Sequence, residues 1–322
     1  MRRREFIAAL GFSTALGSSA RAQGSTRSYS ILWVSTEAQP DPFIAGFREG
    51  MEAHGYVEGR NLSFVLRYAP GDPAALQAML PELLATPADL IVSSGPAIRA
   101  MRAATQKPVL FAVSGDPVEL GVAESLARPG RNFTGSTFLS LELAQKRVQL
   151  IRELLPDLRT LAILSNANHP GEQSEHEATK EAASALSIRL AYAPFGTPPE
   201  IDGALERVRV SGADAMLVFP DAVTMVHRAK IAAFATAQRL PSMFGWREYC
   251  DAGGLASYGS NQRATYVRLA SYADRLLRGE APGGLPVEQP TAFEFILNLK
   301  AAKAIGVEIP PALLARADEV IE

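Results

Sequence analysis

The sequence contains a single cysteine, Cys250, and this scarcity limits how the fold can be stabilised. One thiol cannot form an intramolecular disulfide, so packing must stabilise the protein. Long apolar runs are missing as well, because no run after the leader described below is long enough to cross a bilayer of about 30 Å as a helix. A chain of 322 residues can bury large cores and is usually divided into two domains.

The sequence also lacks the short motifs that mark many enzymes and nucleotide-binding sites. It has no G-x-S-x-G, no G-x-G-x-x-G and no Gly-Lys-Ser/Thr. The four histidines do not have the spacing of metal ligands, and His169 and His176 lie in a glutamate-rich stretch that we interpret as a solvated helix face. Cys250 has no paired base, which is typical of an inert thiol. We therefore expect a protein that is not an enzyme and that needs no cofactor or metal.

An excess of basic residues is absent too. The chain has 32 Lys and Arg residues against 34 Asp and Glu residues, a net charge of −2. Four of the basic residues lie within the first 22 positions, so the remainder is more acidic still. A nucleic-acid partner requires a basic patch or stripe, and we expect none here.

The first 22 residues have the pattern of an export signal. Three arginines at 2–4 precede an apolar stretch at 6–16, and Ala20-Arg21-Ala22 supplies the small residues that a signal peptidase needs. The segment Arg3-Arg4-Glu5-Phe6-Ile7 fits the core of a twin-arginine signal, although the general export route stays open. We predict that residues 1–22 are removed and that the mature protein is periplasmic, without insertion into the membrane.

Short β-rich apolar runs alternate with longer helical patterns through most of the chain. Several runs are apolar at every position, which is what a strand covered on both faces requires. Repeated strand–helix–strand units predict right-handed crossovers and parallel sheets with helices on both faces. The predicted strands are 31–34, 62–67, 89–93, 109–113 and 132–135 in a first series, and 160–164, 188–193, 215–219, 242–244 and 255–258 in a second.

The helical patterns between these runs have recognisable stripes and ends. Phe43, Phe47 and Met51 recur every fourth residue before Gly55, a residue suited to a helix end. A similar stripe covers residues 144–155 and is ended by a proline. The fold class predicted from these patterns is α/β, with two doubly wound parallel-sheet lobes.

We predict that several chain crossings join the two lobes and form a multi-strand hinge. The crossings are expected near residues 136–140, 258–262 and 279–290. The predicted N-terminal lobe comprises 28–137 plus 259–285, and the predicted C-terminal lobe comprises 138–258 plus 286–322.

Ligands of parallel sheets bind beyond the carboxyl ends of the strands, where helix N-termini offer free N–H groups. The residues at these positions are mostly hydroxyls, glycines, acids and aromatics, which suit a small zwitterion or polar metabolite. Each also has a structural interpretation: Asp116 before Pro117, for example, has the pattern of a helix cap. The predicted ligand-binding residues are Ser35, Thr36, Ser94, Ser114, Gly115, Asp116, Asn166, Asp221, Trp246 and Tyr258.

Long ordered segments of the chain resemble a known family. They are 55–61 (GYVEGRN), 115–118 (GDPV), 125–132 (SLARPGRN), 247–249 (REY) and 252–259 (AGGLASYG). In these segments the chain is similar to the ABC-transporter substrate-binding proteins of the tryptophan/tyrosine-binding type, which have the type I periplasmic-binding fold. The resemblance implies two lobes that close over one ligand, and an ABC permease with its ATPase subunits as partners. It also implies binding roles for Ser35, Thr36, Ser94, Ser114, Asp116, Asp221 and Tyr258.

The expected function is the capture of a small ligand, an amino acid or an aromatic or carboxylate metabolite, by a monomer that delivers it to an importer. A ligand-sensing subunit for a membrane receptor would use the same cleft, and the fold does not separate the two. An exported small-molecule hydrolase would need a nucleophile, base or metal at the cleft. A cytoplasmic repressor would need a helix-turn-helix where the leader lies.

Overall fold

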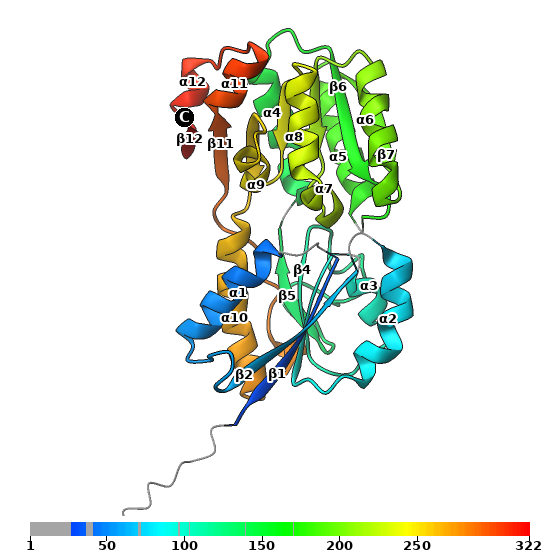
Figure 1. Cartoon of the computed structure of the whole chain (residues 1–322), viewed down its shortest axis with the longest axis vertical. Coiled ribbons are helices and arrows are strands. Elements are labelled where there is room, and N and C mark those ends of the chain that lie inside the picture. Colours follow the sequence, from blue (N-terminus) through cyan, green and yellow to red (C-terminus); the bar gives the residue numbers. More distant parts are fainter. Residues whose placement is uncertain are drawn as a thin grey trace, which may run out of the picture.

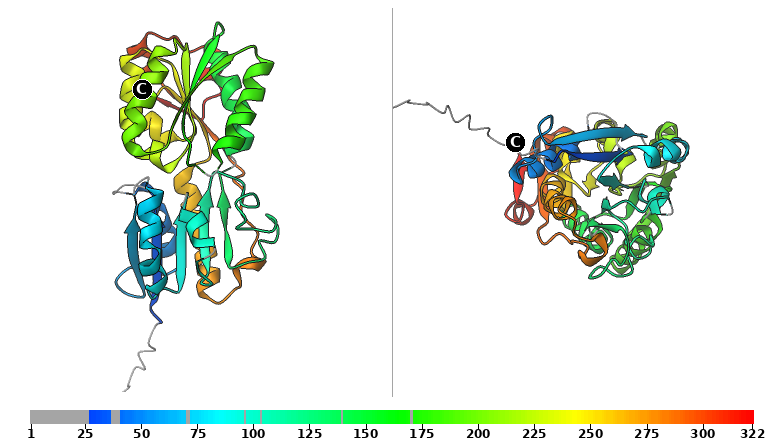
Figure 2. Two further views of the ribbon diagram at one scale, coloured as in Figure 1. Left: turned by 90° about the vertical axis from the view of Figure 1, so that its right-hand side faces the viewer. Right: turned by 90° about the horizontal axis from the view of Figure 1, so that it is seen from below.

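A computed structural model describes residues 27–36, 41–69, 72–95, 97–102, 104–138, 140–169 and 171–322. The predicted signal peptide, residues 1–22, lies outside them. The chain forms two α/β lobes, one above the other in Figure 1, and Figure 2 shows a separate sheet in each. The predicted fold class is confirmed by this arrangement.

The first lobe contains a five-stranded parallel sheet in the order β2-β1-β3-β4-β5. Its helix α10 comes from much later in the chain than the sheet and packs along α1. The strands are β1 (Tyr29–Ser35), β2 (Leu62–Tyr68), β3 (Leu90–Ser94), β4 (Val109–Val113) and β5 (Phe133–Thr137), and the helices are α1 (Pro42–Ala53), α2 (Pro73–Ala85), α3 (Ala97–Arg102) and α10 (Gln262–Leu277).

The second lobe contains a seven-stranded sheet in the order β12-β11-β10-β9-β8-β6-β7. Its strands are β6 (Thr160–Asn166), β7 (Arg189–Phe195), β8 (Ala215–Val218), β9 (Ser242–Phe244), β10 (Ala256–Gly259), β11 (Glu294–Asn298) and β12 (Glu319–Ile321). Its helices are α4 (Ser140–Leu154), α5 (Glu172–Ala185), α6 (Ile201–Val210), α7 (Ala222–Val226), α8 (Arg228–Ala237), α9 (Arg247–Asp251), α11 (Leu299–Ile305) and α12 (Pro311–Leu314). Short 3-10 turns cover Pro198–Glu200 and Pro282–Gly284.

All ten predicted strands are present, with ends within two residues of those predicted. The prediction missed β11 and β12, and β11 runs antiparallel to β10, so the second sheet is mixed rather than purely parallel. Both strands are short. Only the three central residues of β11 (295–297) are apolar, and β12 lies at the sheet edge, half-buried or exposed, where a continuous apolar run is not required.

The chain passes between the lobes after β5, after β10 and again before β11. It stays beside β5 through Glu288, whose N–H donates to the Gly135 carbonyl at 2.8 Å and whose carbonyl accepts the Thr137 N–H at 2.9 Å. The exact residue boundaries of the lobes stay a prediction.

Buried apolar residues form three clusters, and one of them continues from lobe to lobe. It includes Trp33 and Phe47 under the α1 and α10 side of the first sheet and Leu164 and Val218 of the second sheet. Of the other two clusters, one lies within the first lobe and the other lies within the second. The lobes therefore share an apolar contact, and the cavity described below lies within it.

The contact between α1 and α10 depends on Gly50. A Cβ atom added there would lie 2.3 Å from the Val267 carbonyl oxygen and 2.6 Å from the Ala270 Cβ. We predict that Gly50→Ala lowers the free energy of unfolding by about 1–3 kcal/mol, because the helices must separate. Gly203→Ala is the matched control, since its Cβ would meet only the end of Arg207 at 3.6 Å.

Urea unfolding measures both variants. Gly203→Ala should be unchanged or more stable by about 0.5–1 kcal/mol, because alanine favours a helix. Equal effects of the two substitutions would contradict close packing at Gly50.

Candidate functional site

A cavity of about 310 Å³ of empty space, its open mouth included, lies between the lobes. It borders the carboxyl ends of β3 and β4 in the first lobe and of β6, β8 and β9 in the second, where ligands of parallel sheets bind. The enclosed part of this space is only large enough for about one water molecule, so a ligand of amino-acid size needs the lobes to move apart before it can enter. The cavity is lined by Phe43, Ser94, Gly95, Ala112, Val113, Ser114, Phe138, His169, Asp221, Ala222, Trp246 and Tyr266.

Four aromatic rings form the apolar wall. Phe43 stacks on Tyr266 with ring centroids 5.0 Å apart and an interplanar angle of 10°. Trp246 meets Phe43 edge-on at 6.2 Å and Phe138 edge-on at 5.7 Å. The Trp246 side chain is only 4% exposed although it comes from the opposite lobe to Phe43. Flat apolar surfaces in this arrangement are complementary to a ring or a carbon chain.

The position of Phe43 is set by the start of α1. The Asp41 side chain caps this helix by accepting the Phe43 N–H at 2.9 Å, and it also accepts the indole N–H of Trp33 at 2.8 Å. Burial raises the pKa of Asp41, and these hydrogen bonds oppose the rise. The predicted site residue Ser35 hydrogen-bonds Asp41, so it supports this cap.

Asp221 is the acidic group of the cavity. It caps α7, and its Oδ1 accepts the N–H of Val223 at 2.8 Å and the side-chain amide of Asn166 at 3.0 Å. Its Oδ2 is buried and has no hydrogen-bond partner among the described residues, while the whole residue is 2% exposed. A buried carboxylate oxygen without a partner is costly, so this oxygen is available to a cationic group in the cavity.

Hydroxyl groups line the side that the first lobe contributes. Ser94 ends β3, and Ser114 directly follows the neighbouring strand β4. Both serines border the cavity. Thr36 is 1% exposed, and its Oγ1 has no partner within the described structure. This Oγ1 would lie 3.3 Å from a Cβ added to the cavity residue Gly95. Hydroxyls and nearby backbone N–H groups can bind a carboxylate without a full positive charge.

His169 joins the two lobes through a hydrogen bond with Ser114. Its Nδ1 accepts the N–H of Gly171 at 3.2 Å, so Nε2 carries the proton and donates to the Ser114 hydroxyl. Burial lowers the pKa of His169, Asp221 and Glu172 oppose this, and Arg99 adds to it. The imidazole is therefore neutral at pH 7. Since Nδ1 accepts the Gly171 N–H, no carboxylate orients this imidazole as the third member of a catalytic triad would.

A buried ion pair lies close to Asp221 in the second lobe. Arg147 donates to Glu175 at 2.9 Å and, through Nε, to the Tyr258 carbonyl at 2.9 Å. Burial raises the pKa of Glu175 to about 8, Arg147 opposes the rise, and the charges of Glu172 and Asp221 add to it. The negative charge on Asp221 is thus felt by neighbouring groups, and a bound cation would relieve it.

The structure brings some of the predicted site residues together and places others elsewhere. Ser94, Ser114, Asp221 and Trp246 line the cavity, and Asn166 contacts Asp221. Asp116 is exposed and accepts the Val118 N–H at 2.7 Å, but only a turn follows it, so the predicted helix cap was wrong and the side chain closes that turn. Tyr258 packs near Phe293 and Phe295 instead of lining the cavity. Gly115 lies against Gly171, where a Cβ would come within 2.9 Å of it, so the two glycines allow a close approach of the lobes.

The cavity residues that the sequence reasoning missed include the three rings of Phe43, Phe138 and Tyr266 and the imidazole of His169. The interpretation of His169 as part of a solvated face was wrong, because it is 6% exposed and precedes α5. Its place three residues after the end of β6 was the signal, since strand ends mark the site. Phe43 was recognised only as part of a core stripe.

The described residues provide no metal site, no membrane-spanning helix and no reactive thiol. They contain no group of three or more His, Cys, Asp or Glu side chains arranged for a metal ion. No helix among them is both long and apolar enough to cross a bilayer. Cys250 is buried, and burial raises its pKa to about 12, so it stays a thiol.

Several known proteins are similar to this chain over most of its length. The chain is 23% identical over 266 residues to a tyrosine-binding protein of Clostridioides difficile strain R20291, covering 82% of this chain and 76% of that protein. A conserved domain protein from Vibrio cholerae superposes with a TM-score of 0.84 at 26% identity, covering 91% of this chain and 100% of the other. The ABC domain from Streptococcus pneumoniae in complex with L-Trp has a TM-score of 0.84 at 24% identity, with the same coverage.

The family described as ABC transporter substrate binding protein matches residues 33–321, which is most of the chain. The match confirms the resemblance seen in the sequence, and the superpositions share the two-lobed arrangement. The chain therefore belongs to the family of ABC transporter substrate binding proteins and has their type I periplasmic-binding fold.

Proposed function

We propose that this protein binds an amino acid with an aromatic side chain between its lobes and delivers it to the permease and ATPase of an ABC importer. The observation that carries the proposal is the buried, unpartnered Oδ2 of Asp221 in a cavity walled by four aromatic rings. Residues 1–22 would direct the protein to the periplasm, where it acts as a monomer.

Each part of such a ligand has a complementary partner in the cavity. The ammonium group pairs with Asp221 Oδ2, which is otherwise unsatisfied. The carboxylate meets the hydroxyls of Ser94, Ser114 and Thr36. The ring lies against Phe43 and Trp246, where apolar contact and edge-on packing both contribute. A relative named for tyrosine binding and a similar structure that contains L-Trp support this choice of ligand class.

Closure of the lobes is the step by which the permease distinguishes the ligand-bound protein from the free protein. Ligand contacts made by both lobes favour the closed arrangement over the open one, and the closed pair presents a combined surface to the permease. Contacts that already join the lobes include those of Ser114 with His169, Gly115 with Gly171, and Phe43 with Trp246. A dissociation constant near micromolar requires about 8 kcal/mol, which a buried small ligand can supply.

Two alternatives are weaker. A sensor subunit would use the same cavity, and neighbouring genes for a permease and an ATPase would favour transport over sensing. A hydrolase would need an oriented base at the cleft, and the Nδ1 of His169 accepts the Gly171 N–H instead of donating to a carboxylate.

We predict that L-Trp, L-Tyr or L-Phe raises the thermal unfolding midpoint of the mature protein, because the ligand binds only the folded state. Asp221→Asn should weaken that binding by about 30- to 150-fold, the loss of a charged hydrogen bond of about 2–3 kcal/mol. Calorimetry measures the affinity, and Asp116→Asn is the matched control because Asp116 is exposed and does not line the cavity. Unchanged affinity in Asp221→Asn would refute the assigned ammonium site.

A second prediction concerns pH. The folded-state pKa of His169 is lowered, so below the unfolded value of about 6.5 the unfolded chain binds a proton that the folded one excludes. The contribution of His169 to stability should therefore be complete above pH 7 and fall as the pH drops, by up to about 1.4 kcal/mol per unit. Glu175, whose pKa is raised to about 8, changes stability in the opposite sense over this range, so the contribution of His169 is the difference between the wild type and His169→Gln.

Urea unfolding between pH 5 and pH 8 measures this slope. His169→Gln should reduce it, since glutamine does not titrate. The pKa of His227 is also lowered, and His227→Gln serves as the comparison because this residue is only half-buried and lies away from the cavity. Identical slopes for the wild type and His169→Gln would show that His169 is not held neutral by the fold.

A further inference from the structure

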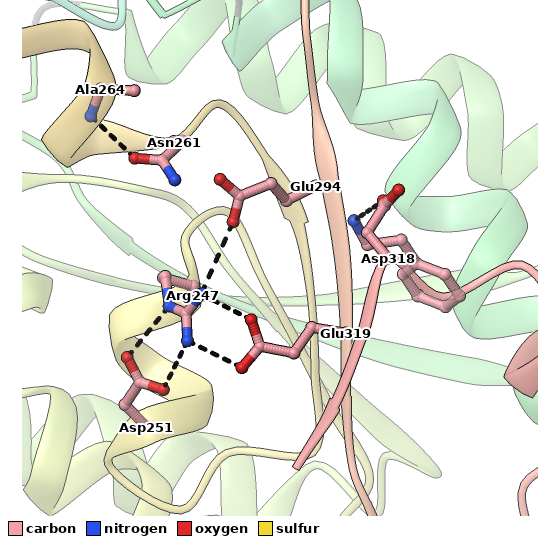
Figure 3. Close-up of polar contacts among 8 residues, drawn as sticks. Arg247, Asp251, Asn261, Ala264, Glu294, Asp318 and Glu319 are labelled. Carbon is pink, nitrogen blue, oxygen red and sulfur yellow. Dashed lines mark hydrogen bonds and ion pairs between the residues drawn. The ribbon is translucent and has the colours of Figure 1, made fainter.

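Arg247 follows the cavity residue Trp246 directly and lies among three carboxylates (Figure 3). Its guanidinium makes a two-pronged contact with Glu319, at 2.9 and 3.0 Å, and contacts Asp251 at 3.3 and 3.4 Å. Glu294 lies 3.9 Å away. These hydrogen bonds raise the pKa of Arg247, so it is charged at every relevant pH.

The three acids belong to different parts of the second lobe. Asp251 ends α9, Glu294 begins β11 and Glu319 begins β12. Glu294 is paired with Gly259 at the end of β10, so Arg247 reaches the point where one crossing leaves the lobe and another enters it. A single side chain therefore links the loop that carries Trp246 to the starts of β11 and β12, of which β11 begins at the hinge.

The other sides of this loop are already fixed by close backbone packing. A Cβ atom at Gly259 would lie 1.8 Å from the Gly245 carbonyl oxygen, and a Cβ at Gly245 would lie 2.6 Å from Pro220. Pro220 precedes the cavity acid Asp221. The Trp246 side chain makes no capping hydrogen bond to α9, so Arg247 supplies the polar anchor at the start of that helix.

We propose that Arg247 is a positioning residue for the ligand site, which holds Trp246 against Phe43 and Phe138 and couples it to the start of β11 at the hinge. It acts through Trp246 and does not line the cavity. Its effect on ligand affinity rests on the proposed function, but its effect on Trp246 is present without ligand.

The geometry favours arginine over lysine at this position. A guanidinium contacts two carboxylates at once in fixed directions, whereas an ammonium group is a single point charge. Arg247 is 31% exposed and Glu319 47% exposed, so solvent screens the pairs and their contribution to overall stability is small. Loss of Arg247 should therefore loosen Trp246 while leaving the unfolding midpoint nearly unchanged.

Fluorine NMR of protein labelled with 5-fluorotryptophan tests this directly, because the chain has two tryptophans. Trp246→Phe assigns the resonances, and Trp33, which is 2% exposed in the first lobe, is the internal reference. In Arg247→Ala the Trp246 resonance should shift or broaden while that of Trp33 stays in place. Affinity for the aromatic amino acid should fall about tenfold, which is 1.4 kcal/mol, and Arg247→Lys should restore only part of it.

Arg316→Ala is the matched control, because Arg316 pairs with Glu153 in the same lobe with similar exposure and lies away from Trp246. Glu319→Gln is the second variant, which removes the two-pronged contact without shortening the side chain. An unchanged Trp246 resonance in both Arg247→Ala and Glu319→Gln would overturn the inference. A perturbed resonance in a protein whose wild type binds no aromatic amino acid would support the positioning role and refute only the proposed ligand.

Discussion

The carboxyl ends of two sheets face each other across one cleft, and the other features of the molecule follow from this constraint. Parallel strands bring their C-terminal loops and helix starts to the same edge, so each lobe contributes its polar and aromatic loop residues to a common cavity. Chain crossings after β5, after β10 and before β11 keep the two edges opposed. Close backbone approach at Gly115 and Gly171 then lets the lobes meet without a gap.

Few ionisable groups line the cleft, so the charge that is present is confined to one end of it. Asp221 presents one buried oxygen without a partner, whereas His169 is neutral because burial lowers its pKa. No Lys or Arg is among the described residues that line the cavity. A cationic group consequently has one preferred end of the site, and the aromatic wall takes the apolar part of the ligand. This separation would give a bound zwitterion one orientation in the cleft.

The sequence was sufficient for the ten strands of the two main series, because strands covered on both faces must be apolar at nearly every position. It was also sufficient for Asp221 and Trp246, since both follow strand ends. It was insufficient for β11 and β12, whose short or exposed runs carry no such pattern. The sequence did not identify Tyr266 and Phe138 as cavity residues. Their positions depend on how α10 returns to the first lobe and on where the chain crosses between the lobes, and no local pattern encodes either. The same reason explains Tyr258: it follows the strand-end rule, yet β11 and its neighbouring residues cover it.

The central claim is that a small ligand closes the two lobes. Gln77 and Thr197 are exposed on opposite walls of one groove at the lobe boundary, and buried Cys250 will not react with a label. Electron–electron distance measurement between spin labels at Gln77→Cys and Thr197→Cys, with and without L-Trp or L-Tyr, tests it most directly. The account predicts one short, narrow distance with ligand and a longer, broader distribution after its removal. The same distribution in both samples, at a ligand concentration that calorimetry shows to be saturating, would contradict it.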